Sequence, residues 1–153
     1  MEALFEAYVA RHLPRQLRAD FTLKPHASSQ HLVIHDDQQW FRLKPDLLVK
    51  HRQDTRLVLD TKWKLLETGK KNGREKYQLS QADFYQCYAY GHHYLDGAGD
   101  ILLIYPKTDA FAAALPVFAF PKSIGMRLWV LPFCLNSRKL LLPVASSFDA
   151  MFR

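Results

Sequence analysis

The segment LVLDTKWK, residues 57–64, constrains this chain more than any other, because an apolar strand runs straight into an acid, a hydroxyl and two lysines. A buried strand more often ends in turn residues such as Gly, Asn or Pro. Side chains alternate between the two faces of a strand, so Asp60 and Lys62 lie side by side on one face and Thr61 lies on the other. Either the strand reaches solvent here, or Asp60 and Lys62 are placed for chemistry.

A second acid lies one hairpin upstream. Residues 40–50, WFRLKPDLLVK, are predicted to form a strand with Pro45 at an irregular or edge position, and residues 51–55, HRQDT, are predicted to form the hairpin loop. A turn at that loop brings Asp46 to about the level of Asp60. The pattern therefore predicts two carboxylates and one ammonium group at one end of a strand pair.

Such a group of charges suits a divalent metal ion. Two neighbouring carboxylates repel each other when both are ionised, and a cation relieves that repulsion. Magnesium prefers oxygen ligands, so Asp46 and Asp60 would bind it, with the backbone carbonyl of Thr61 as a further ligand. The ion would activate a water and stabilise charge on a phosphodiester. Lys62 would orient or deprotonate that water, or stabilise the negative transition state.

The alternative interpretation is structural. An isolated acid and lysine two residues apart often form an exposed ion pair at a strand end, and such pairs contribute little to stability. Asp46 upstream, and the charge of the surrounding region, are the features that favour the chemical interpretation over this one.

Positive charge is concentrated around the same segment. Residues 41–80 hold 11 Lys and Arg against 5 Asp and Glu, whereas the rest of the chain holds 10 of each. The net charge of +6 therefore comes from one region, and a local basic field favours a polyanion such as nucleic acid. A solvated basic loop is the alternative. The region supplies Lys64, Lys70 and Lys71 as candidate DNA-contacting residues.

The apolar periodicity predicts one α/β domain over residues 1–153, with a mixed sheet flanked by helices. Ser80 is expected to cap the second helix, with Asp83 as the acid of a weak capping box. The predicted elements are, in chain order, a helix at 2–13 ended by Pro14, strand pieces within 21–34, a turn at 35–39, strands at 40–50 and 56–64, a basic loop at 67–79, a helix at about 81–95, strands at 100–106, 115–120 and 126–133, and a short helix at 146–153.

Composition narrows the class of protein. Hydrophobic residues make up 48% and aromatic residues 13%, which is too apolar for a disordered chain. No apolar run approaches the ~20 residues that a membrane helix needs, and the acidic N-terminal segment is not a secretory signal. Cys87 and Cys134 lack metal-ligand spacing and are expected to be reduced and buried in a cytoplasmic protein.

Pro45-Asp46 followed by Asp60-Thr61-Lys62 resembles the PD-(D/E)xK nuclease motif. Five blocks also occur in the order seen in McrC-like proteins, the nuclease subunits of the 5-methylcytosine-specific restriction system. These blocks are LFEAYVARHL (4–13), KPDLLVK (44–50), LVLDTKWK (57–64), SQADFYQCYAYGHHY (80–94) and ILLIYP (101–106). The resemblance covers about residues 1–110, and residues 111–153 offer little to match.

This resemblance implies a restriction endonuclease-like fold and a protein that cuts DNA with the help of a magnesium ion. Manganese is expected to substitute for magnesium. Carried over by position, Asp46 and Asp60 are metal ligands and Lys62 is the catalytic lysine. Glu6, on the first helix, matches the acid that often completes the metal site in this superfamily. The alternative for Glu6 is a solvated position on an amphipathic helix.

Two residues of the second helix extend the resemblance. Gln86 and Tyr90 match the Q-x-x-x-Y pattern of the RecB-like branch of this superfamily. They are four residues apart, so they share one helix face and can both point at the site or at DNA. The alternative is that they only satisfy buried hydrogen bonds beneath the sheet.

The resemblance leaves partner and substrate open. McrC proteins usually carry a long N-terminal region that engages a GTP-hydrolysing McrB-like partner, whereas this chain begins at the first nuclease helix. DNA is the expected ligand. The sequence does not decide whether the protein is a monomer or a homodimer. Methyl recognition belongs to the partner in that system, so this domain is not expected to read a modified base. The alternatives are a catalytically idle DNA-binding or assembly domain, and a junction-resolving or RNA-acting nuclease.

Overall fold

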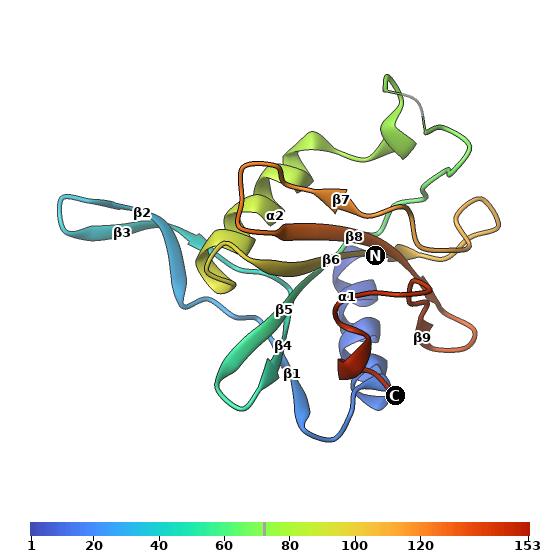
Figure 1. The fold of residues 1–153 in the computed structure, drawn as a ribbon, viewed down its shortest axis with the longest axis horizontal. Helices are drawn as coiled ribbons and strands as arrows, with labels where there is room; N and C mark the ends of the chain where they lie inside the picture. Colours follow the sequence, from blue (N-terminus) through green and yellow to red (C-terminus); the bar gives the residue numbers. More distant parts are fainter. Residues whose placement is uncertain (72) are drawn as a thin grey trace.

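A mixed sheet with a helix on each face forms the body of the chain in the computed structural model, which describes residues 1–71 and 73–153 (Figure 1). The elements are α1 (Glu2–His12), η1 (Leu13–Gln16), β1 (Phe21–Pro25), β2 (Gln30–His35), β3 (Gln38–Leu43), β4 (Leu47–His51), β5 (Asp54–Thr61), η2 (Lys76–Gln78), α2 (Gln81–Tyr94), β6 (Gly99–Pro106), β7 (Phe118–Ala119), β8 (Met126–Cys134), β9 (Lys139–Leu140) and η3 (Asp149–Met151).

The main sheet has the strand order β1-β4-β5-β6-β8-β7, with β9 also paired to β8. β1, β4 and β5 are antiparallel neighbours, whereas β5, β6 and β8 run parallel. β7 and β9 are both antiparallel to β8. The mixed sheet flanked by helices is the predicted restriction endonuclease-like architecture, and that prediction is confirmed.

Alternating side chains of the central strands divide the core between the two faces of the sheet. Leu59 of β5 packs in the same cluster as Phe5 of α1, and Val58 packs in the opposite cluster with Cys87 of α2. Fully burying one such side chain contributes about 1.5–3 kcal/mol. β6 is covered on both faces, which explains why its sequence, residues 99–106, lacks an alternating pattern.

The predicted strand over residues 40–50 is wrong, because two strands of different sheets meet there. β3 ends at Leu43 and pairs with β2 in a separate two-stranded sheet, which projects from the body as a hairpin (Figure 1). β4 begins at Leu47 and enters the main sheet. Pro45 lies between them, and a proline both lacks a backbone N–H and restricts the residue before it. Residues 44–46 therefore form a crossover, the short connection by which the chain passes from the two-stranded sheet to the main sheet.

Other boundaries also differ from the prediction. The loop predicted at residues 51–55 is a two-residue turn, since His51 pairs with Asp54. Residues 115–120 contribute only the two residues of β7, and the predicted helix at residues 146–153 is the single turn η3. α1 ends just before Pro14 and α2 ends at Tyr94, close to the predicted limits.

The two cysteines are free in the structure. Cys87 is buried in the core, whereas Cys134 is only half-buried at the end of β8. The prediction that both thiols are buried is therefore confirmed for Cys87 and wrong for Cys134.

Replacing Gly91 tests how closely α2 approaches the sheet. A Cβ at this position would overlap Met126 Sδ and lie 2.9 Å from Ile101 Cδ1, and both of those side chains are buried. Gly91→Ala is therefore expected to lower the free energy of unfolding by about 1–3 kcal/mol, although alanine is normally favoured over glycine in a helix. Urea unfolding followed by circular dichroism measures this change.

Gly69→Ala is the control, because nothing lies within 4 Å of a Cβ added there. Its free energy of unfolding should stay within about 0.5 kcal/mol of wild type. A Gly91→Ala protein as stable as this control would contradict the close packing of α2.

Candidate active site

The pairing of β4 with β5 places Asp46 beside Asp60. Leu47 pairs with Leu59 in the antiparallel register, so the residue before β4 stands level with Asp60. The Asp46 N–H donates to Asp60 Oδ1 at 3.3 Å. The prediction that the hairpin brings the two acids to one level is confirmed.

Thr61 fixes the orientation of the Asp46 carboxylate. Its backbone N–H and its hydroxyl both donate to Asp46 Oδ2, each at 2.8 Å. Asp46 Oδ1 has no hydrogen-bond partner among residues 1–71 and 73–153. Thr61 therefore positions an acid through its amide and hydroxyl groups, and ligation of a metal by its carbonyl stays a prediction.

Lys62 extends from the same strand end into a cluster of oxygens. Its ammonium lies 3.1 Å from Asp60 Oδ2 and 3.5 Å from Asp83 Oδ1. It also donates to Gln86 Oε1 at 3.4 Å. The structure thus brings together Asp46, Asp60 and Lys62, the three predicted catalytic residues.

Asp83 is a site residue that the sequence interpretation missed. Its spacing predicts a capping box with Ser80, and Ser80 does occupy the N-cap position of α2. The Ser80 side chain makes no capping hydrogen bond, however, and the Asp83 carboxylate pairs with Lys62 instead. The available signal was the spacing to Gln86 and Tyr90, three and seven residues on, which places all three on one helix face.

Gln86 and Tyr90 reach the two strands from α2. Gln86 accepts the hydrogen bond from Lys62, as described above. The Tyr90 hydroxyl donates to the Lys44 carbonyl at 3.2 Å, within the crossover that leads to Asp46. Both predicted residues therefore lie at the site, Gln86 against the lysine and Tyr90 against the backbone that carries an acid.

Burial and neighbouring charge alter the acidity of these groups. Burial, and next the carboxylate of Asp46, raise the pKa of Asp60 from 3.8 to about 7, against a lowering contribution from Lys62. Burial acts to lower the pKa of Lys62, but the adjacent Asp60 carboxylate outweighs it and raises that pKa above its usual range. Burial and the two nearby carboxylates raise the pKa of Tyr90. Lys62 is thus a firmly protonated cation in this site.

Glu6 of α1 approaches the site but pairs with another residue. Its Oε1 lies 3.5 Å from Nδ1 of His26, a residue that sequence reasoning did not single out. Burial, and next the charge of Asp46, raise the pKa of Glu6, so the two acids are close enough to interact. The metal-binding role of Glu6 stays a prediction.

The donor chemistry at the strand ends fits a hard divalent cation. Two carboxylates with a free oxygen on Asp46 match the one or two acidic ligands that magnesium typically takes. Over residues 1–71 and 73–153, no three His, Cys, Asp or Glu side chains are grouped so that they could hold a metal ion. Asp46 and Asp60 are therefore the residues that would hold an ion, with remaining ligands from water or substrate.

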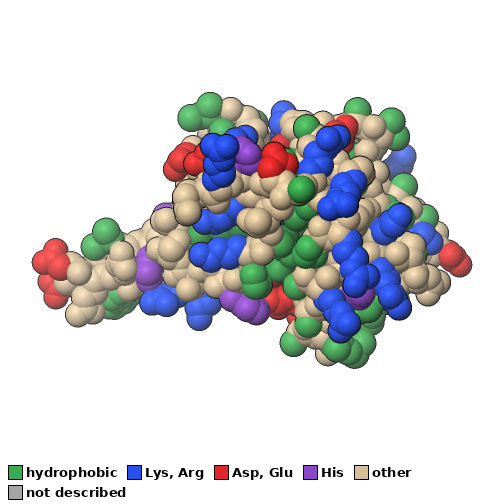
Figure 2. Space-filling model, turned by 90° about the horizontal axis from the view of Figure 1, so that it is seen from below, with side chains coloured by type: hydrophobic (Ala, Val, Ile, Leu, Met, Phe, Trp, Pro, Cys, Tyr) green, Lys and Arg blue, Asp and Glu red, His purple; other side chains and the backbone are tan. Residues whose placement is uncertain are grey.

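The predicted DNA-contacting lysines lie in the segment that follows β5. Lys64 donates to the Gln78 carbonyl, which ties the strand exit to η2. Lys70 lies 3.5 Å from Glu67, and Lys71 is exposed. Figure 2 shows Lys and Arg side chains spread over a broad face of the molecule. Contact of these lysines with DNA stays a prediction.

These observations first define a class of protein: a restriction endonuclease-like α/β fold that carries paired carboxylates and a lysine at the ends of two adjoining strands. The sequence model of the family described as McrBC 5-methylcytosine restriction system component matches residues 1–106. The chain therefore belongs to this family, as the resemblance of its motifs predicted.

A solved structure shares the fold. It is the refined half-complex from a tetradecameric assembly of Thermococcus gammatolerans McrB AAA+ hexamers with bound McrC, and it matches with a TM-score of 0.62 at 19% sequence identity. The match covers 98% of this chain and 30% of that chain. At this identity the likeness shows the fold alone. A comparison with curated proteins finds no match.

Within the described residues, neither α1 nor α2 is long and apolar enough to cross a membrane. This finding agrees with the hydropathy of the sequence.

The buried carboxyl of Asp60 predicts a pH-dependent stability. Its pKa is raised on folding, so the stability that the protonated group contributes is present below about pH 4 and is lost as pH rises towards 7. Asp60→Asn mimics the neutral carboxyl and retains an oxygen for the Asp46 N–H. In EDTA, the variant should match wild type near pH 4 and exceed it by on the order of 1–4 kcal/mol at pH 8.

Chemical unfolding at several pH values between about 4 and 8 measures this difference. Asp54→Asn, at the exposed hairpin turn, is the matched control and should show no such trend. A stability difference for Asp60→Asn that does not change with pH would contradict the raised pKa.

Proposed function

We propose that this chain is a nuclease domain of a restriction system that hydrolyses phosphodiester bonds in DNA with a magnesium ion. One observation carries the proposal: Asp46, Asp60 and Lys62 converge at the ends of β4 and β5. Membership of the restriction-system family supports it. Manganese is expected to substitute for magnesium.

Asp46 and Asp60 would hold the metal ion in this proposal. A bound magnesium ion supplies a Lewis acid that activates water and stabilises negative charge on a phosphate. Thr61 preorganises Asp46, because two donors fix one carboxylate oxygen and leave the other open. The backbone N–H of Asp46 in turn orients Asp60.

Lys62 acts as a cation in this proposal and not as a base. The sequence allowed either role, but a lysine next to the Asp60 carboxylate keeps its proton at neutral pH. A protonated ammonium at this position can orient the attacking water and stabilise the charge that develops on the phosphate. Asp83 and Gln86 of α2 also contact the ammonium, so its position does not depend on Asp60 alone.

We further infer that an McrB-like AAA+ subunit is the partner of this chain. The solved structure that shares the fold is described as McrB hexamers with bound McrC, and this chain spans 30% of the chain that it matches there. With such a partner, the nuclease domain would be one part of a larger assembly. Hydrolysis of DNA by the isolated chain is therefore the decisive first measurement.

Cleavage of supercoiled plasmid tests the proposed function. Wild type should nick or linearise both methylated and unmethylated plasmid in magnesium or manganese, and Asp60→Asn and Lys62→Ala should lower the rate by at least about a hundredfold. The rates are measured from gel band intensities over time. Asp54→Asn and Lys122→Ala are matched controls, since both residues are exposed and lie outside the site, and they should cut like wild type.

Loss of cutting in both site variants and in neither control supports the proposal. Equal cutting by wild type and Asp60→Asn would refute it, because the activity would then come from elsewhere or from a contaminant.

Metal binding gives a readout that does not depend on cutting. Manganese should raise the melting temperature of wild type, because a ligand that binds only the folded state stabilises it. Asp46→Asn should lose most of that shift, while Asp54→Asn should retain it. Thermal melts at matched ionic strength, with and without manganese, make the comparison.

A wild type that binds manganese but cuts no plasmid would point to a site that awaits its partner subunit. A wild type that neither binds the ion nor cuts would contradict the proposed metal site.

A further inference from the structure

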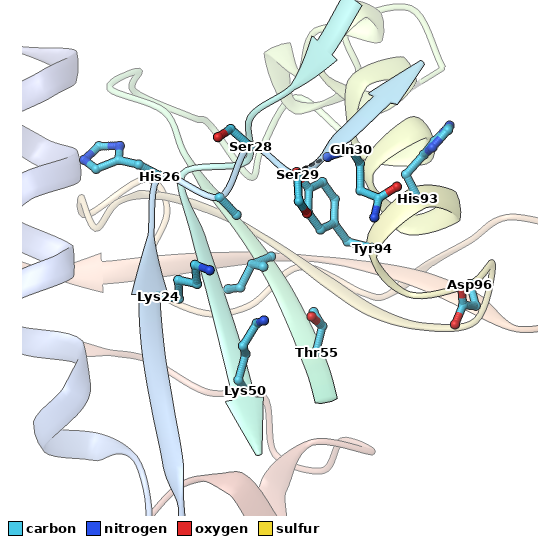
Figure 3. A pocket seen from close by; sticks show the side chains of 12 residues that line it. Lys24, His26, Ser28, Ser29, Gln30, Lys50, Thr55, His93, Tyr94 and Asp96 are labelled. Atoms are coloured by element: carbon cyan, nitrogen blue, oxygen red, sulfur yellow. Dashed lines mark hydrogen bonds between the residues drawn. The ribbon is translucent and has the colours of Figure 1, made fainter. Parts of the chain in front are cut away.

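A polar pocket of about 470 Å³ lies on the α2 side of the β1–β4–β5 edge of the sheet (Figure 3). Its walls come from distant parts of the chain: β1, the segment that leads into β2, β4, β5 and the end of α2. The side chains that line it include Lys24, Ser28, Lys50, Thr55, His93 and Asp96. These groups are mostly hydrogen-bond donors, which suits an anionic ligand.

Lys24 and Lys50 supply the positive charge of the pocket. They project from adjacent antiparallel strands, where Lys24 pairs with Leu48 and Lys50 with Thr22. Within the described residues, neither ammonium lies within 4 Å of a carboxylate. Asp96 is the acid among the described lining residues, and Figure 3 shows it on the far side of the pocket from Lys24. Two cations therefore converge without a counter-ion from the chain.

The pocket shares a wall with the candidate active site. The His26 N–H donates to the Asp46 carbonyl at 3.0 Å, and the His26 side chain pairs with Glu6. His26 also lines the pocket, so one residue borders both sites. Leu48, which lines the pocket, lies two residues along β4 from Asp46, a separation of about 7 Å.

We propose that this pocket binds a backbone phosphate of the DNA strand whose neighbouring phosphodiester lies at Asp46 and Asp60, and this inference rests on the proposed function. Lys24 and Lys50 neutralise the phosphate, and the hydroxyls of Ser28 and Thr55 donate to its oxygens. Lysine ammonium groups and side-chain hydroxyls are common phosphate partners in protein–DNA complexes.

The spacing fits a strand that passes over β4. Positions 48 and 50 lie two and four residues from Asp46, or about 7 and 13 Å along the strand. The rise of about 3.4 Å per nucleotide is measured along the helix axis, and successive phosphates of one strand lie roughly twice as far apart because the backbone winds round that axis. A phosphate in the pocket therefore lies roughly one or two nucleotides from the scissile one. The pocket would therefore set the register of the DNA backbone relative to the carboxylates without reading its bases.

Salt-dependent DNA binding tests the pocket. A fluorescein-labelled duplex of about 20 base pairs is titrated in EDTA, so that no cutting occurs, and the slope of log K against log salt is measured by anisotropy. The double variant Lys24→Gln/Lys50→Gln should weaken binding on the order of tenfold and reduce the magnitude of that slope by about two. Lys24→Arg/Lys50→Arg keeps the charge and should retain the wild-type slope.

Lys122→Gln/Lys139→Gln is the matched control. It removes the same two charges, but from exposed positions beside β7 and β8, at the opposite edge of the sheet. It should bind DNA with the wild-type slope. Circular dichroism melts establish that all variants are folded.

Each outcome either supports or overturns the inference. An unchanged slope in Lys24→Gln/Lys50→Gln overturns it, as does an equal loss in the control, which would indicate a general field and not a pocket. A free anion is the other source of phosphate. If inorganic phosphate raises the melting temperature of wild type and not of this variant, while DNA binding is unaltered, the strand assignment is wrong.

The plasmid assay, run in parallel, separates this inference from the proposed function. If wild type cuts plasmid but the slope is unchanged, only the pocket assignment fails. If the slope falls as expected but wild type neither cuts plasmid nor binds manganese, the proposed function fails while the pocket stands. A wild type that does not bind the duplex overturns the pocket assignment.

Discussion

The hydrogen bonds that join Asp46 to the end of β5 are the interaction on which the candidate site depends. Asp46 receives two donors from Thr61 and gives its own N–H to Asp60, so the start of β4 and the end of β5 are tied together through side chains. A slip of one residue in this register would put the two acids on opposite faces of the sheet. The same contacts therefore define the strand pairing and the geometry of the carboxylates.

These contacts place charge where folding alone would not favour it. Asp60 is only 3% exposed, and burial beside Asp46 raises its pKa to about 7. Lys62 offsets part of that destabilisation, and α2 supplies Asp83 and Gln86 to hold the lysine. A structural ion pair would not need a second acid, half-buried, beside the buried one. Local destabilisation with several supporting contacts is typical of a site selected for binding or chemistry.

How far the sequence predicts this arrangement depends on the range of the interactions. Asp46 and Asp60 lie level with each other because a short hairpin joins their strands, so local spacing was sufficient to predict this arrangement. The split of residues 40–50 into two sheets was missed, because a single proline does not reveal that β3 has another partner. Asp83 was misassigned because an acid near a helix start satisfies a capping pattern equally well. The pairing of Glu6 with His26 joins α1 to the end of β1, and no local pattern indicates it.

The crossover at residues 44–46 links the separate hairpin to both sites. Two tyrosines of α2 hold its beginning, since Tyr90 donates to the Lys44 carbonyl and Tyr94 donates to the Leu43 carbonyl. One helix thus fixes the chain just before Asp46 and, through Tyr94, a wall of the polar pocket. Without a cation, the carboxylates at the strand ends would repel a DNA phosphate. Lys24 of β1 and Lys50 of β4 supply the opposite charge nearby, so one edge of the sheet can attract the backbone while the ends of β4 and β5 hold the acids.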